Sequence, residues 1–242
     1  MRNRYIFLLL TCKILFGQIS ITGSLKPTGM FRLSDQSRMD LPFRLTELKL
    51  GYTMGDFDFM LNSAVEHRWG ENMSAIDLRE AYVIWFPNWG EVKFGKQIHA
   101  WGAADGNNPT DNLNPYDYYY MFHPGTDQKI GMMSFSTKIY YTNIQMEGII
   151  NPIHESNRMP FGEKDFPLIM SQNPVVLYEV DGQLEVGFRV QSSTPLGDFS
   201  FSIFKGNDRM PSLLTANITL QEGVPPVITQ FNLGYRTTTV WG

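Results

Sequence analysis

The stretch GKQIHAWGAADGNNPTDNLNP, from Gly95 to Pro115, is the part of the chain that decides its fold. Its first residues close a strand of alternating apolar and polar side chains, and the rest opens a long segment of Gly, Asn, Asp and aromatic residues. Alternation with a period of two residues is typical of a β-strand with two different faces. The chain around it repeats this order of strand, turn, strand and long loop, so the sequence predicts an all-β fold.

About ten strands are expected, and their connections fall into two classes. The predicted strands are 19–33, 45–52, 57–66, 75–86, 91–100, 129–141, 144–150, 175–190, 198–205 and 228–241. Tight turns follow the second, fourth, sixth and eighth strands, and longer connections lie between them, above all 101–128, 151–173 and 206–226. Such sorting is expected of an antiparallel up-and-down transmembrane β-barrel. A soluble β-sandwich, the alternative all-β fold, has no reason to sort its connections in this way.

Alternation also divides the strands into a lipid-facing side and a lumen-facing side. In the third strand Phe57, Phe59, Leu61 and Val65 oppose Asp58, Asn62, Glu66 and Arg68. In the eighth, Leu184, Val186, Phe188 and Val190 oppose Glu185, Arg189 and Gln191; in the last, Phe231, Leu233 and Tyr235 oppose Asn232, Gly234 and Arg236. A charge on the lipid face costs ~2–4 kcal/mol at mid-bilayer. The polar residues are therefore expected to line a water-filled interior.

The N-terminus predicts export from the cytoplasm. Arg2 and Arg4 precede an apolar run from Tyr5 to Phe16, and small residues near 17–20 suit cleavage, so residues 1–20 are expected to be a signal peptide and 21–242 the barrel. A lipoprotein modified at Cys12 is the alternative.

The net charge of the mature chain follows from this cleavage. The signal carries three of the 20 Lys and Arg and none of the 24 acids, so the mature chain has a formal charge of 17 − 24 = −7. A negative chain argues against a nucleic-acid partner.

Neither a helical membrane span nor an enzyme is indicated. No segment after the signal approaches the ~18 consecutive apolar residues that a spanning helix needs. The four histidines, His67, His99, His123 and His154, belong to no Gly-x-Ser-x-Gly or His-Glu-x-x-His motif. We therefore expect no enzymatic activity and no bound cofactor.

Several short motifs resemble a family of porin-like outer-membrane barrels known only as a domain of unknown function. They are Leu-Arg-Glu-Ala-Tyr at 78–82, Gly-Lys-Gln at 95–97, Trp-Gly at 101–102, Asp105, and the segment 111–115, which begins with Asp111 and ends with Asn114-Pro115. The motif residues are Arg79, Glu80, Lys96, Gln97, Trp101, Gly102, Asp105, Asp111, Asn114 and Pro115. The family pattern has Arg where this chain has Lys96, which keeps the charge and loses a bidentate fork. The resemblance implies a barrel architecture and a class of function, without a substrate.

The segment 101–128 is the candidate functional element, because long loops without secondary structure are uncommon unless they have a role. It is expected to fold inward and narrow a pore, with Trp101, Asp105, Asp111, Asp117, Tyr118 and Tyr120 as constriction candidates. Its three acids would favour cations, or would hold a calcium ion, while lumenal Lys49, Lys93, Arg189 and Arg236 would offset them. The alternative is a plain loop whose Asp and Asn residues stabilise turns and whose aromatics lie at the membrane surface.

These observations predict a channel in the bacterial outer membrane for diffusion or export of a small solute, in contact with lipid and with the barrel assembly machinery. The alternative is a surface protein that the barrel only anchors. The chain stops at Trp241-Gly242 without the terminal aromatic residue of such barrels, so it is expected to be an incomplete, N-terminal part of its barrel.

Overall fold

The computed structural model describes residues 18–101, 112–160, 163, 175–221 and 223–242. It is all-β apart from two short 3-10 helices, η1 (Tyr118–Tyr120) and η2 (Gly125–Gln128). The first strands are β1 (Gln18–Leu25), β2 (Pro42–Met54), β3 (Phe57–Arg68), β4 (Met73–Trp85), β5 (Gly90–Gln97), β6 (Met132–Tyr141) and β7 (Ile144–Asn151). The others are β8 (Val175–Val180), β9 (Glu185–Thr194), β10 (Gly197–Asn207), β11 (Ser212–Gln221), β12 (Val224–Tyr235) and β13 (Thr237–Trp241). No helix among these residues is long and apolar enough to cross a membrane.

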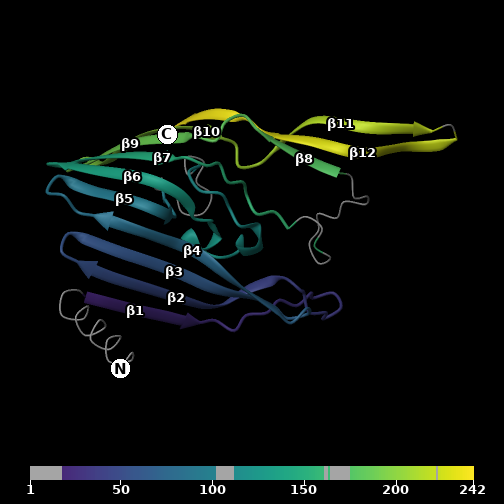
Figure 1. The fold of residues 1–242 in the computed structure, drawn as a ribbon, viewed down its shortest axis with the longest axis horizontal. Helices are drawn as coiled ribbons and strands as arrows, with labels where there is room; N and C mark the ends of the chain where they lie inside the picture. Colours follow the sequence, from purple (N-terminus) through teal and green to yellow (C-terminus); the bar gives the residue numbers. More distant parts are fainter. Residues whose placement is uncertain (1–17, 102–111, 161–162, 164–174, 222) are drawn as a thin grey trace, which may run out of the picture.

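Ten strands form one antiparallel sheet in the order β1-β2-β3-β4-β5-β6-β7-β9-β10-β13 (Figure 1). Four hairpins, β2–β3, β4–β5, β6–β7 and β9–β10, turn through two to four residues at the same end of this sheet. The opposite end carries the long connections, and only the link between β3 and β4 there is short. The sorting of connections expected from the sequence is therefore present.

The sheet is open. Within the described residues β1 and β13 are its two edge strands, and they do not pair with each other.

The second half of the chain departs from the predicted strands. The expected strand 175–190 is two strands, because Asp181 and Gly182 form a break between β8 and β9. The expected loop 206–226 contains β11, whose Thr215, Asn217 and Thr219 alternate with apolar residues. The expected strand 228–241 divides at Arg236 into β12 and β13.

Strands β11, β12 and β8 build a separate three-stranded sheet that extends away from the main one (Figure 1). The Asp181 carboxylate accepts hydrogen bonds from the Arg236 guanidinium (3.1 Å) and the Thr237 backbone N–H (3.0 Å), and so ties the break after β8 to the junction of β12 and β13. The first predicted strand is also shorter than expected, since β1 ends at Leu25, before Pro27.

The main sheet has one apolar face. The strand registers place Phe57, Phe94, Phe135, Phe188 and Phe201 on it, and each is more than 40% exposed. Among the strand residues that share this apolar face by register, only Lys96 and Lys205 are charged, and both lie near the end of the sheet that carries the long connections.

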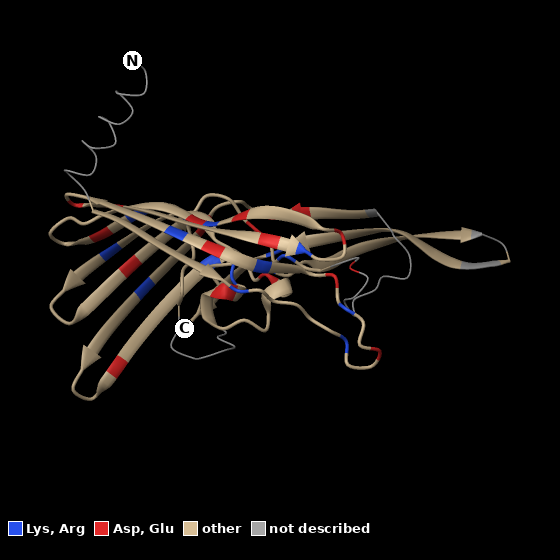
Figure 2. Cartoon of the chain, turned by 90° about the horizontal axis from the view of Figure 1, so that it is seen from below, with Lys and Arg blue, Asp and Glu red and all other residues tan. Residues whose placement is uncertain are grey.

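The other side is the charged face. By register it carries Glu47, Lys49, Asp58, Glu66, Glu80, Glu91, Lys93, Lys138, Glu147, Glu185, Arg189 and Asp198. Figure 2 shows acidic and basic residues interspersed along neighbouring strands of the sheet. The predicted division of β3 and β9 into an apolar and a polar side is confirmed. The last predicted strand does not stay in the main sheet: Tyr235 ends β12 and is buried, and Arg236 lies exposed between β12 and β13.

A small apolar core lies on the charged face, where Trp101, Leu113, Ile149 and Phe204 pack together. Gly187 of β9 permits this packing, because a Cβ atom there would lie 2.8 Å from the Trp101 ring. Residues 112–131 are named the inner segment below. They contribute Leu113 to this core and carry both 3-10 helices (Figure 1).

Candidate functional site on the charged face

Arginine side chains hold the inner segment against the charged face, and the buried Arg44 of β2 is the first. Its guanidinium lies 3.4 Å from a carboxylate oxygen of Asp117 and 3.8 Å from one of Glu66, and it stacks 3.7 Å from the centre of the Tyr120 ring. It also donates to the carbonyl oxygen of Asp127. One wall residue therefore contacts both 3-10 turns of the inner segment.

Arg79 of β4 makes a second attachment nearby. Its side chain is 3% exposed and donates to the Glu47 carboxylate at 2.8 Å, so its charge is compensated within the wall. The same guanidinium reaches the Asp127 carboxylate at 3.2 Å and the Thr126 carbonyl at 2.9 Å. Arg79 thus joins two strands to the turn at η2.

Arg158 attaches a second loop to the same place. It contacts both carboxylate oxygens of Glu66 at 3.0 Å and Asp117 at 3.1 Å, while the Tyr120 hydroxyl donates to Glu66 at 2.9 Å. Burial raises the pKa of the Asp117 carboxyl, and the Arg158 and Arg44 guanidinium groups oppose that rise. Asp117 is 2% exposed and carries a compensated charge, so it adds little to a negative field in a pore.

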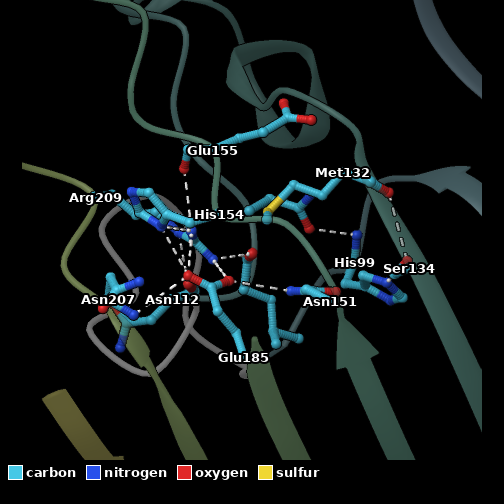
Figure 3. Close-up of polar contacts among 12 residues, drawn as sticks. His99, Asn112, Met132, Ser134, Asn151, His154, Glu155, Glu185, Asn207 and Arg209 are labelled. Atoms are coloured by element: carbon cyan, nitrogen blue, oxygen red, sulfur yellow. Dashed lines mark hydrogen bonds and ion pairs between the residues drawn. The ribbon is translucent and has the colours of Figure 1, made fainter. Parts of the chain in front are cut away.

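Arg209 makes the fourth attachment, shown in Figure 3, on the other half of the sheet. It donates to the two carboxylate oxygens of Glu185 at 2.9 and 2.7 Å and to the Leu113 carbonyl at 2.7 Å. A ring nitrogen of His154 lies 2.8 Å from Glu185. Glu185 is fully buried, and the bidentate pair compensates its charge.

Trp101 is held in place by a similar ion pair. Its indole N–H donates to Glu147 at 3.0 Å, and Arg189 donates to the same oxygen at 2.6 Å while lying 5.4 Å from the indole ring centre. Removing one partner from a buried pair of this kind typically costs about 3–5 kcal/mol. Trp101, which follows the end of β5, is thus attached to β7 and β9.

The motif residues meet where β5 leaves the wall. Asn114 donates its amide to the Gln97 carbonyl (3.2 Å) and the Ile130 carbonyl (2.8 Å), and accepts from the His99 N–H at 2.6 Å. Glu80 accepts from the Ile98 N–H at 3.1 Å. These bonds satisfy the backbone of a segment that has left the sheet, which assigns Glu80 and Asn114 a structural role. The buried Gln97 side chain donates to the Ser134 carbonyl at 3.0 Å and so joins β5 to β6. Burial lowers the pKa of His99 to about 3 in the same junction.

The other residues singled out from the sequence are spread over the molecule. Lys49 and Lys93 lie on the charged face toward the tight turns, where Lys93 pairs with Glu91 at 3.6 Å. Lys96 lies on the apolar face by register, and Arg236 is exposed beside Asp181, away from the other lumenal candidates. Pro115 is buried and Tyr118 half-buried in the inner segment. Gly102, Asp105 and Asp111 lie outside the described residues.

Calcium finds no support in the described part of the chain, where no group of three or more His, Cys, Asp or Glu side chains could hold a metal ion. Two of the three acids considered for it, Asp105 and Asp111, lie outside that part.

Sequence reasoning missed three of the arginines. Alternation had already placed Glu66, Glu185 and Arg189 on the polar side, but Arg158 and Arg209 lie in connections without periodicity. Arg44 lies beside an irregularity in the β2–β3 register, so its side could not be read from alternation.

Comparison with family models, with curated proteins and with solved structures finds no match to this chain. The resemblance to porin-like barrels therefore rests on the motif residues alone.

Proposed function

We propose that this chain forms the wall of a porin-like channel in the bacterial outer membrane, through which a small solute diffuses or is exported. The observation that carries the proposal is the division of the main sheet into an exposed apolar face and a charged face. Among the strand residues of the apolar face only Lys96 and Lys205 are charged, as suits contact with lipid. Strands of eight to thirteen residues, such as β1 and β2, approach or exceed the ~9–11 residues that cross a bilayer at a tilt.

Lipid contact also requires the edges of the sheet to be satisfied. Unpaired backbone groups in hydrocarbon cost several kcal/mol each, so spanning sheets close on themselves. In the membrane the edge strands β1 and β13 therefore pair with other strands to complete a ring around the charged face.

The inner segment is the proposed constriction. It lies against the charged face, where Arg44, Arg79 and Arg158 hold it through ion pairs with Asp117 and Asp127. Arg209 holds it through a hydrogen bond to the Leu113 carbonyl. A segment folded inward would narrow the lumen. Because four arginines fix its position, it would not move about and block the lumen.

Reconstitution in planar lipid bilayers tests the proposal. A channel gives discrete, reproducible conductance steps, whereas a protein anchored by its barrel gives none. Protease protection in the same lipid confirms insertion, and detergent buffer without protein is the control. Insertion without steps would replace the channel by an anchored surface protein.

A further inference from the structure

A cavity of about 450 Å³ lies beside the Arg209 attachment, between the inner segment, the end of β10, the residues after it and β13. Its volume falls within the range of small-molecule sites, ~300–1,000 Å³. The lining combines amide, hydroxyl and aromatic side chains with only two charged residues, Asp208 and Arg209.

The charge available to a ligand there is small and negative. Arg209 is 9% exposed, and its guanidinium is already occupied by Glu185 and by carbonyl groups of the surrounding loops. The Asp208 carboxylate is exposed, and within the described part of the chain it makes no ion pair. A cavity that offers one free carboxylate and a neutralised arginine disfavours anions.

Several neutral groups remain available beside that carboxylate. Tyr118, Ser212 and Thr238 line the cavity, and among the described residues their hydroxyl groups make no hydrogen bond. Hydroxyls both donate and accept, a carboxylate accepts, and an aromatic ring offers an apolar face. This combination matches a ligand with many hydroxyl groups and a partly apolar ring surface.

The backbone around the cavity is fixed in advance. The Tyr118 N–H donates to the Arg158 carbonyl (3.0 Å), and the Asn157 N–H to the Arg209 carbonyl (3.2 Å). The Asp208 N–H donates to the Arg236 carbonyl at 2.9 Å, which holds the carboxylate-bearing residue against the β12–β13 junction. A preorganised site loses less conformational entropy on binding than a mobile one.

We infer that this cavity binds a neutral, polyhydroxylated solute such as a mono- or disaccharide, with Tyr118 stacking on its ring and Asp208, Ser212 and Thr238 bonding its hydroxyls. The inference deepens the proposed channel function, since it assigns the solute class and a binding subsite on the charged face.

Isothermal titration of the full chain in lipid nanodiscs tests the inference with three probes: maltose, glucose 6-phosphate and choline. We expect saturable binding of maltose and none of the other two. Tyr118→Ala and Asp208→Asn should each weaken maltose binding at least tenfold. Thr239→Ala, a neighbour of Thr238 on the other side of β13, should leave it unchanged.

The possible outcomes separate this inference from the channel. Absence of maltose binding, preference for choline or glucose 6-phosphate, or equal affinity in all variants would overturn it. Circular dichroism of each variant distinguishes a lost site from a lost fold, and Ser212→Ala, at an exposed hydroxyl, gives a milder second variant. Maltose binding without conductance steps would leave the subsite standing and remove the channel.

Discussion

The partners of single buried side chains decide how much charge the charged face presents, and Asp117 is an example. As one of three acids in a polar loop it predicts a negative field. In the structure Arg44 and Arg158 compensate it at 3.4 and 3.1 Å, so it acts as an attachment for the inner segment. The residues around Asp117 come from β2, from β3 and from the loop around residue 158. These segments are far apart in the sequence, so no local sequence pattern predicts that they meet.

His99 should make the stability of the fold depend on pH. Burial holds its pKa at about 3, against an ordinary value of 6.5. Between these two pH values the folded chain therefore binds fewer protons than the unfolded chain. The stabilisation is complete above pH 6.5 and is lost as pH falls toward 3; at pH 5 the loss is about 2 kcal/mol. Urea unfolding in lipid vesicles between pH 7.5 and 5 should show this slope.

His99→Gln keeps a hydrogen-bonding partner for Ser134 and should remove most of the slope. His67→Gln, at a half-exposed site beside Ser74, is the matched control and should keep it. Equal slopes in all three proteins would assign the pH dependence to other groups.

At the scale of elements, the two faces of a strand make different predictions for neighbouring residues. Phe201 and Ser200 are adjacent in β10 and both exposed, but Phe201 lies on the apolar face and Ser200 on the charged one. If the apolar face contacts lipid, Phe201→Arg should lower the unfolding free energy in vesicles by ~2–4 kcal/mol. Ser200→Arg should change it by less than ~1 kcal/mol, as expected for surface sites.

Equilibrium unfolding in vesicles and the heat-shifted gel mobility of folded barrels both report this difference. A soluble sheet would tolerate both arginines equally, and that result would contradict a lipid-facing role for the apolar face.

The elements also show how far the sequence leads. From β2 to β7 the sequence predicts each strand and its tight turns, from alternation where one face is apolar and the other polar, and from the flanking turn residues in β4 and β6, which alternate poorly. Beyond Asn151 the chain uses uncharged Thr, Asn and Gln in β11 and β12, and alternation there does not say which sheet a strand joins. The Asp181 break and the parallel pairing of β8 with β12 depend on contacts distant in sequence. For the same reason, sequence analysis did not identify Arg158 and Arg209.

At the scale of the whole molecule, the arginine attachments should control the width of the proposed channel. Replacing Arg44 and Arg158 together by Gln removes both cations that contact Asp117 and Glu66. Two buried carboxylates would then lose these cationic partners, and the inner segment should detach. Single-channel conductance should rise severalfold and become noisier.

Lys49→Gln is the control, because Lys49 lies exposed on the same face toward the tight turns and takes no part in the attachments. Its conductance should stay close to that of the parent chain. If the double variant kept the parent conductance while remaining folded, the inner segment would not be the constriction.

These attachments join residues that are far apart in the sequence, and this separation suggests an order for the steps of folding. Each tight hairpin joins neighbouring strands and can form locally, but Arg209 meets Leu113 across 96 residues and Arg158 meets Glu66 across 92. Closing such large loops costs entropy that only a preformed surface recovers. The wall is therefore expected to assemble first and the inner segment to dock last. If the chain forms the proposed channel, every newly made molecule would pass through a stage in which the lumen is still unobstructed.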